Sequence, residues 1–237
     1  MCIKEATLFF PVYQTVRSDW EGNYMIEKEA FVAAFNTALA DKGKRKFTQT
    51  AELMINFTSI DFNKQDNRLN LELLLPKGKG KEMKIGVFTD GGQVALDAKN
   101  AGFTTINSDE IAKLGADRPK LKALAKTHEF LAEPKLMMVV GKSLGQFLGT
   151  RDKLPKPLVG AQMAALADKV RRSVRLKSKG KYLPVVQCAV GNENMSAADL
   201  AENAYAVYEA ARNKVGGDFF VKSVMVKLSM GKPVKVG

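Results

Sequence analysis

Residues 76–88 read PKGKGKEMKIGVF, and this stretch divides the chain into parts of different character. Pro76, Gly78 and Gly80 stand among lysines, a composition that predicts a solvated joint rather than a helix or strand. Before the joint we expect a helix over 25–41 and strands over 50–57 and 69–75. After it, an apolar run at 83–88 predicts a short buried strand and the start of a new unit.

The residues that follow alternate between short apolar runs and helical patterns. We expect strands at 83–88, 104–106 and 130–132, helices at 91–101 and 108–126, and an apolar turn at 135–140. Strands separated by helices favour right-handed crossovers and a parallel, Rossmann-like layer. Residues 141–160 contain four glycines together with Pro155 and Pro157, which predicts loops and a second joint.

Beyond the second joint the pattern returns to that of the first residues. Helices are expected at 162–172 and 196–214, strands at 174–176, 185–190 and 219–229, and a helix cap at Ser196 with Asp199. The predicted fold class is therefore α/β with two domains. Domain I is an α+β domain from residues 25–75 and 159–237, and the inserted Rossmann-like domain II spans 76–158. The two crossings predict a hinge at Gly78, Gly80, Pro155 and Pro157.

The charge balance points to a polyanionic partner. Thirty-seven Lys and Arg against 25 Asp and Glu leave a net charge of +12. Residues 76–158 carry 15 basic and 9 acidic side chains, and residues 159–237 carry 13 and 6, so the surplus lies in these two segments. Basic groups mixed with acids in this way favour folded surfaces that touch phosphates over a basic tail. With 46% hydrophobic residues the chain has enough apolar material for a core, which excludes a disordered scaffold.

Membrane and redox signals are weak. The longest uncharged run near the start, residues 6–16, is too short to span a bilayer, so we expect a soluble, cytoplasmic protein with no membrane partner. Cys2 and Cys188 are far apart in sequence, which favours two unpaired thiols in a reducing compartment.

No catalytic constellation is recognisable, so no catalytic residue, metal or cofactor is predicted. His128 is the only histidine, and it is interpreted as a helix-end or surface residue. Gly141-Lys142-Ser143 resembles the end of a phosphate-binding loop, but the leading glycine is replaced by Leu136. A nucleotide-binding enzyme that uses the middle layer is kept as an alternative.

Three segments, two of them basic, are candidates for nucleic-acid contacts. Residues 44–50 (KRKFTQT) combine cations for phosphates, an aromatic ring for a base or sugar, and polar groups for 2′-OH. The alternative is a solvated loop with Phe47 in the core. Ser229-Met230-Gly231 ends the last strand, either as a place of close backbone approach or as an ordinary strand end. The third segment consists of Arg171, Arg172, Arg175, Lys177, Lys179 and Lys181.

Together the motifs resemble the archaeal type of the large-subunit ribosomal protein L-one family. The resemblance covers residues 25–237 and rests on KGKRKFTQTAE (42–52), LPKGKGK (75–81), VGKSLGQFLG (140–149), KLPKP (153–157), VGNENMS (190–196) and SMG (229–231). It implies the same two-domain fold, in which domain I is an α+β sandwich that holds RNA.

The function that the resemblance implies is that of a structural constituent of the large ribosomal subunit, without enzymatic activity. Members bind 23S-type rRNA at the mobile stalk beside the tRNA exit site and assist release of deacylated tRNA. Many also repress translation by binding their own mRNA. The implied partners are this rRNA, the messenger, exit-site tRNA and the large subunit, and the chain is expected to be a monomer off the ribosome. A non-ribosomal RNA-binding regulator is the second alternative.

Site residues follow from the resemblance by position. The implied RNA contacts are Lys46, Phe47, Thr50, Glu52, Ser223, Ser229, Met230 and Gly231, with secondary phosphate contacts at Arg45, Arg175 and Lys177.

Three departures from the family pattern stand out. Lys232 replaces a proline after the Ser229–Gly231 turn, and residues 149–155 read GTRDKLP where the family has GPRGKMP. Residues 1–24 have no counterpart; because Met25 begins the familiar helix, a misread start is preferred to a real N-terminal extension.

Overall fold

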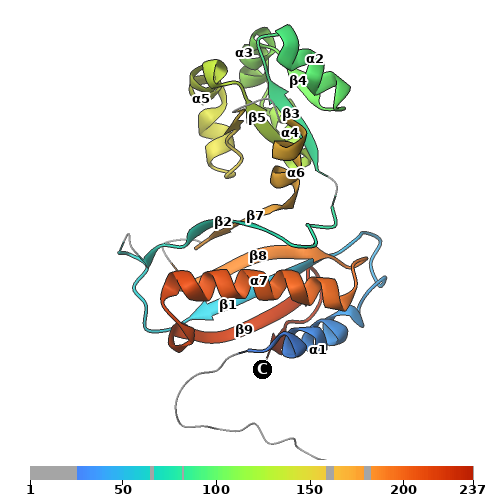
Figure 1. Ribbon diagram of the computed structural model, residues 1–237, viewed down its shortest axis with the longest axis vertical. Coiled ribbons are helices and arrows are strands. Elements are labelled where there is room, and N and C mark those ends of the chain that lie inside the picture. The colour runs from blue at the N-terminus through green and yellow to red at the C-terminus, as the bar shows by residue number, and fades with distance from the viewer. Residues whose placement is uncertain (1–25, 65–66, 82, 159–162, 179–182, 237) are drawn as a thin grey trace, which may run out of the picture.

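The computed structural model describes residues 26–64, 67–81, 83–158, 163–178 and 183–236. Residues 1–24, Cys2, Lys179 and Lys181, which the sequence singles out, lie outside these ranges. Figure 1 shows the ribbon, with helices α1 and α7 against one sheet and a second group of helices around another. Among the described residues, every helix is too short or too polar to traverse a bilayer.

One sheet is built from both ends of the chain. Its strand order is β10-β9-β1-β8, with every neighbouring pair antiparallel. The strands are β1 (Thr50–Phe57), β8 (Val185–Asn192), β9 (Val221–Leu228) and β10 (Val234–Val236). In β1 every second side chain, beginning with Ala51, is buried, which is the period of a sheet covered on one face.

Two helices cover that buried face. Helix α1 (Lys28–Leu39) contributes Phe31 and Phe35 to the core, and α7 (Ala197–Val215) contributes a stripe that includes Leu200 and Tyr208. The predicted cap of α7 is confirmed, because the Asp199 backbone N–H donates to the Ser196 side chain at 3.1 Å. After the 3-10 turn η2 (Asp218–Phe220), β9 begins at Val221, so the long last strand predicted from Phe219 is two residues shorter at its start.

A two-stranded ribbon extends the first sheet. It pairs β2 (Asn70–Leu74) with β7 (Ser173–Lys177), and a bridge from Ser178 to Val186 joins it to β8. Val174 and Leu176 of β7 are buried in the same core as α1 and α7. The ribbon therefore continues the sheet at its β8 edge.

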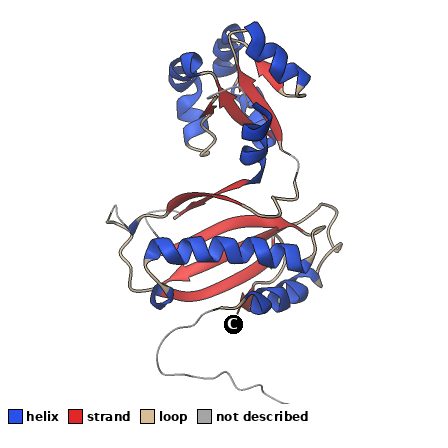
Figure 2. Ribbon diagram, viewed as in Figure 1, coloured by secondary structure: helices blue, strands red, loops and turns tan. Residues whose placement is uncertain are grey.

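The middle of the chain forms a parallel sheet in the order β4-β3-β5-β6. The strands are β3 (Lys84–Phe88), β4 (Thr104–Ile106), β5 (His128–Ala132) and β6 (Lys156–Pro157). Helices α3 (Ser108–Ala116), α4 (Arg118–Thr127) and α5 (Pro134–Gly149) bury apolar residues on one face, and α2 (Gly92–Asn100) and α6 (Met163–Arg172) do so on the other. Figure 2 shows these helices on both sides of the red strands, as the alternation in the sequence predicts.

The sequence prediction was wrong for α5. Residues 134–149 form one helix, where a turn and a loop-rich stretch were expected. Its Leu136, Val140, Leu144 and Leu148 are buried at a spacing of four residues, and this apolar stripe outweighs the three glycines on the rest of the helix. The glycines of residues 141–149 were read as loop signals, although tertiary packing holds them in a helix.

Helix α6 also packs in a different place from that expected. Residues 159–172 were grouped with the chain ends, but Ala167 and Val170 are buried against Ile85, Val87 and Leu131 of the parallel sheet. Strand β7, which follows directly, returns to the first core.

Candidate nucleic-acid interface

The two segments expected to contact RNA meet at one end of the antiparallel sheet. Strands β1 and β9 are neighbours, with Ala51 opposite Leu228. The Ser229 backbone N–H donates to the Thr50 carbonyl at 3.0 Å, and the Thr50 N–H donates to the Ser229 hydroxyl oxygen at 3.2 Å. The side-by-side strand pairing proposed from the sequence is therefore present, and it brings residues 44–50 and 229–231 together.

We call the place where residues 44–50 and 229–231 meet the junction. The Gln49 side chain holds it together, a role that sequence reasoning missed. Its side chain is 1% exposed. The side-chain amide donates to the Asp41 carbonyl and to Glu193 Oε2, each at 3.3 Å, and its Oε1 accepts from the Met230 N–H at 3.2 Å. The only signal in the sequence is a lone amide between a cationic run and a strand.

Large apolar side chains stand exposed on both sides of this junction. Phe47 is 52% exposed and Met230 is 59% exposed. The alternative in which Phe47 lies in the core is therefore wrong. Exposed aromatic and thioether groups next to cations provide a surface on which bases or sugars can stack.

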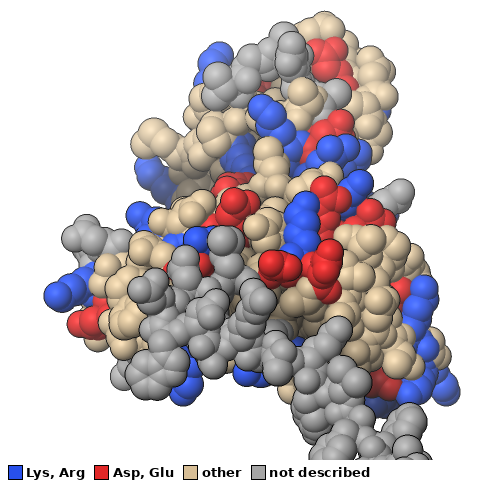
Figure 3. All heavy atoms as spheres, turned by 60° about the horizontal axis from the view of Figure 1, so that its bottom comes forward, with Lys and Arg blue, Asp and Glu red and all other residues tan. Residues whose placement is uncertain are grey.

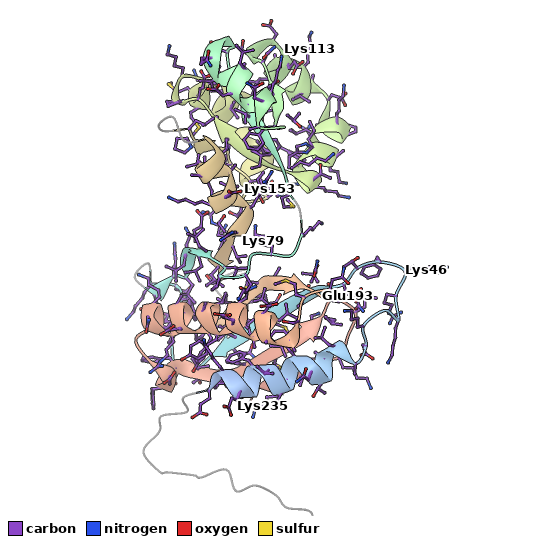
Figure 4. The ribbon with its side chains drawn as sticks, turned by 45° about the vertical axis from the view of Figure 1, so that its right-hand side comes forward. Lys46, Lys79, Lys113, Lys153, Glu193 and Lys235 are labelled. Atoms are coloured by element: carbon purple, nitrogen blue, oxygen red, sulfur yellow. The ribbon has the colours of Figure 1, made fainter. Side chains whose placement is uncertain are left out.

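The cations of the loop are exposed to solvent. Lys44, Arg45 and Lys46 are exposed, and Figure 4 shows Lys46 at the tip of the loop, beyond the end of the sheet where Glu193 lies. The Lys44 ammonium lies 2.6 Å from Asp41 Oδ1, and this hydrogen bond holds the pKa of the Asp41 carboxyl below its ordinary value. Arg45 and Lys46 are placed where phosphates can approach from solvent.

The remaining candidate residues lie on the face of the sheet that is turned away from α1 and α7. We call this the outer face; it carries Thr50, Glu52, Met54 and Asn56 of β1, Gln187 and Ala189 of β8, and Ser223, Met225 and Lys227 of β9. Glu52 lies 3.6 Å from Lys227, and Asn56 Nδ2 donates to the Ser223 hydroxyl at 2.9 Å. Ser223 is six residues before Ser229, about 20 Å at ~3.3 Å per residue, so the candidate site runs the length of the strand.

The sheet surface is hollowed beside Thr50. The hollow has a volume of about 530 Å³ and is lined by Thr48, Thr50, Ala189, Asn192 and the segment around Lys79. Figure 3 shows basic and acidic side chains interspersed over the surface in view, in keeping with the mixed charge of the sequence.

Arg175 and Lys177, the secondary phosphate contacts expected from the sequence, are engaged within the chain. Lys177 Nζ lies 2.9 Å and Arg175 Nη1 lies 3.5 Å from Asp152 Oδ1. The Arg175 Nε–H also donates to Asn70 Oδ1 at 3.0 Å. Both cations are on β7, apart from the junction around Gln49.

The glycines expected to form a hinge have the backbone conformation that glycine favours. Gly78 has φ +70° and Gly80 has φ +65°. Their carbonyls accept hydrogen bonds from Asn203 Nδ2 at 2.9 Å and Asn192 Nδ2 at 2.6 Å, so this crossing is tethered to the first sheet and α7. The second joint expected at Pro155 and Pro157 is not at these residues, because Pro155 is buried and Pro157 pairs with Ala132 inside the parallel sheet. The chain crosses back to the first core between α6 and β7.

The groups with catalytic potential in other proteins have structural roles here. His128 ends α4, as expected for a helix-end residue, but it is 8% exposed, so the surface reading was wrong. Burial lowers its pKa, and its ring nitrogens lie 2.7 Å from Thr127 Oγ1 and 3.4 Å from Thr104 Oγ1. Burial raises the pKa of the Cys188 thiol to about 12. Within the described ranges, no three His, Cys, Asp or Glu residues gather as metal ligands would.

Comparison with known proteins shows which proteins this chain resembles in sequence. A sequence profile described as "Ribosomal protein L1p/L10e family" matches residues 37–232. The "Large ribosomal subunit protein uL1" of Thermococcus kodakarensis is 39% identical over 214 residues, covering 89% of this chain and 98% of its own length. Proteins of the same name from Methanothermococcus thermolithotrophicus and Methanocella arvoryzae are 36% and 37% identical, covering 89% and 90% of this chain and 99% and 100% of their own.

A mixed α/β protein with this sequence similarity is a ribosomal protein of the large subunit. More particularly, the chain belongs to the Ribosomal protein L1p/L10e family, as the resemblance read from its motifs predicted. The expected location, on ribosomes in the cytoplasm, is that of the family.

Proposed function

We propose that the chain binds 23S-type rRNA at the ribosomal stalk through the outer face and the junction around Gln49. The observation that carries this proposal is the meeting of residues 44–50 and 229–231, with Phe47 and Met230 exposed on either side. No catalytic role is proposed. The same surface binds the chain's own mRNA and so represses translation, and on the ribosome the protein assists release of deacylated tRNA from the exit site.

The chemistry of the face suits an A-form RNA helix. Arg45 and Lys46 approach phosphates, and Phe47 supplies a ring for a sugar or base face. Thr50, Glu52 and Ser223 present oxygens to 2′-OH groups across a wide minor groove, whereas the A-form major groove is too narrow for side chains to read. Shape and 2′-OH contacts therefore provide specificity, and the surplus of positive charge provides salt-dependent affinity.

Ser229 has a positioning role in this arrangement. Its hydroxyl accepts from the Thr50 N–H and lies 3.3 Å from the Thr50 carbonyl, to which it donates. These bonds fix the turn that presents Met230, and Gly231 follows where a Cβ would come within 3.2 Å of the Leu228 side chain. The turn as a whole, rather than the serine alone, is the proposed contact.

The division of labour between domains is part of the proposal. The domain built around the core from both chain ends carries every primary contact residue. The parallel-sheet unit is inserted into this domain. Gly78 and Gly80 on one side, and the passage from α6 to β7 at Arg172 and Ser173 on the other, form the hinge between them.

Met230→Asp tests the proposal, because it places a carboxylate where phosphates are expected. We expect at least a tenfold loss of affinity for a stalk-helix rRNA fragment, measured by fluorescence anisotropy with the full chain. Met138→Asp is the matched control, since Met138 is 72% exposed on α5, outside the proposed contact, and the change in charge is the same. Equal affinities for the two variants would remove the turn at Met230 from the interface.

A further inference from the structure

Arg175 and Lys177 extend the outer face beyond β8. Val174 and Leu176 of β7 point into the core under α7, so the side chains between and after them point to the opposite side. Strand β7 continues the sheet next to β8 through the Ser178–Val186 bridge. A hollow of about 500 Å³ is lined by both cations together with Gln187, which lies on the outer face.

A carboxylate from the parallel-sheet unit already forms ion pairs with these two cations. Asp152 follows α5, in the part of the chain that builds the parallel sheet. Its two carboxylate oxygens lie 2.9 and 3.1 Å from Lys177 Nζ, and Oδ1 lies 3.5 Å from Arg175 Nη1. A carboxylate held between a lysine and an arginine presents oxygens as a phosphate group would.

The backbone at Asp152 has a conformation that costs stability in most residues. Its φ is +54°, and Ser59 is the other non-glycine residue among the described ones with positive φ. Aspartate tolerates this left-handed region better than most side chains do, though less well than glycine. The chain therefore accepts a strained position that presents a carboxylate to β7.

The contact is weak enough to be exchanged. The side chains of Arg175, Lys177 and Asp152 are 46%, 52% and 39% exposed, and ion pairs at such exposure contribute little to stability. A phosphate of an RNA backbone carries a charge comparable to that of the Asp152 carboxylate, and neighbouring phosphates of the same strand bind the protein together with it. It therefore competes well with Asp152 for the same two cations.

The surroundings favour an anion. This hollow and the adjoining one contain three carboxylates against six cations, which are Lys79, Arg151, Lys153, Lys156, Arg175 and Lys177. Glu72 pairs with Lys156, and Glu129 lies 3.6 Å from Lys153. Figure 4 shows Lys79 and Lys153 in the region between the two sheets, and burial lowers the pKa of Lys79.

We propose that Asp152 is an internal competitor that closes the phosphate contact expected at Arg175 and Lys177. RNA that reaches β7 from the outer face displaces Asp152 and thereby breaks one of the contacts between the inserted unit and the ribbon, while the Lys156–Glu72 pair remains. The inference rests on the proposed function, because it assumes that RNA lies on the outer face.

The test compares Asp152→Asn with the wild-type full chain for binding of the stalk-helix rRNA fragment across a salt series. Asp152→Asn is expected to bind about three- to tenfold more tightly, with a salt slope steeper by roughly one to two, since each added phosphate contact contributes about 0.9. Asp152→Gly, which suits the positive φ, is expected to give the same gain and guards against a folding defect in the first variant. Asp97→Asn is the matched control, because it removes one negative charge on α2.

Combination with Arg175→Gln and Lys177→Gln identifies the site. In that background the gain from Asp152→Asn is expected to disappear, because the cations it frees are gone. Unchanged affinity in Asp152→Asn, an equal gain in Asp97→Asn, or a gain that survives loss of both cations would each overturn the inference. Failure of the proposed function is distinguishable, since the wild type would then not prefer the stalk fragment to a scrambled duplex.

Discussion

Phe47 is an exposed side chain on which RNA binding is expected to depend. Phe47→Ala removes the exposed ring beside Arg45 and Lys46 and should cost ~1–3 kcal/mol of binding free energy, the scale of a lost stacking contact. The measurement is titration of the stalk-helix fragment with each variant. Leu96→Ala is the control, because Leu96 on α2 is exposed to a similar degree, 56% against 52%. Unchanged affinity in folded Phe47→Ala protein would exclude this ring from the interface.

Gln49 is expected to matter for stability as well as for binding. Gln49→Leu leaves the Met230 N–H and Glu193 Oε2 without their amide partner in a buried place. The free energy of unfolding should fall by about 1–3 kcal/mol, the cost of unsatisfied buried polar groups. Urea denaturation measures it, with Gln93→Leu on the exposed face of α2 as the control. A loss no larger than that of the control would mean that Gln49 does not lock the junction.

At this scale the sequence singled out candidate contact residues that lie together, but not the residues that hold them in place. Phe47, Thr50 and the Ser229–Gly231 turn were singled out by residue type and by family resemblance, and they do lie together. Gln49 and Asp152 were not singled out. The role of Gln49 depends on a partner 181 residues away in the chain, and the role of Asp152 depends on its backbone φ angle. A local sequence pattern contains neither the partner nor the angle.

Helix α5 offers a test of how an element tolerates glycine. A Cβ at Gly141 or Gly145 would meet nothing within 4 Å beyond its own helix and chain neighbours, and neither residue has a positive φ. Because alanine is favoured over glycine inside a helix, the double variant Gly141→Ala/Gly145→Ala should gain about 1–2 kcal/mol of unfolding free energy.

Thermal or urea unfolding measures that gain, and Gly216→Ala provides a control of opposite sign. Gly216 ends α7 with φ +96°, where alanine is strained and should destabilise the protein. A loss of stability in the α5 variant would show that the helix face carrying Gly141 and Gly145 packs against a neighbour that leaves no room for the added methyl groups.

The elements show why local pattern misled in two places. The spacing of Leu136, Val140, Leu144 and Leu148 is helical, but the glycines between them are also typical of loops, and a local pattern does not decide between the two signals. Helix α6 was correctly predicted as a helix over nearly the right residues, yet its partner was not. Which sheet an amphipathic helix covers depends on tertiary packing, whereas the sequence alone shows only which face of the helix is apolar.

For the whole molecule, the pairing of β2 with β7 suggests that the inserted unit is dispensable for binding. Leu74 lies opposite Ser173, and the Leu75 N–H donates to the Arg172 carbonyl at 3.1 Å. Replacing residues 76–171 by Asn-Gly should therefore close an ordinary β-hairpin. The shortened chain should fold and bind the stalk-helix fragment at least as tightly as the wild type, because every primary contact residue is retained and the Asp152 carboxylate that pairs with Lys177 is removed.

Circular dichroism first establishes that the shortened chain is folded, and anisotropy then gives its affinity. A folded chain that no longer binds would place essential contacts in the parallel-sheet unit. At this scale the sequence predicted an insertion from two composition breaks, while the strand register that makes the excision possible came only from the structure.

Binding of the purified full chain to a stalk-helix rRNA fragment, beside a scrambled duplex of the same length and across a salt series, is the most direct test of the central claim. Specific recognition predicts tight binding to the fragment that persists at moderate salt, with weak binding to the scrambled duplex. Equal affinity for both, lost together as salt rises, would contradict the claim, because the +12 charge alone would then account for the binding.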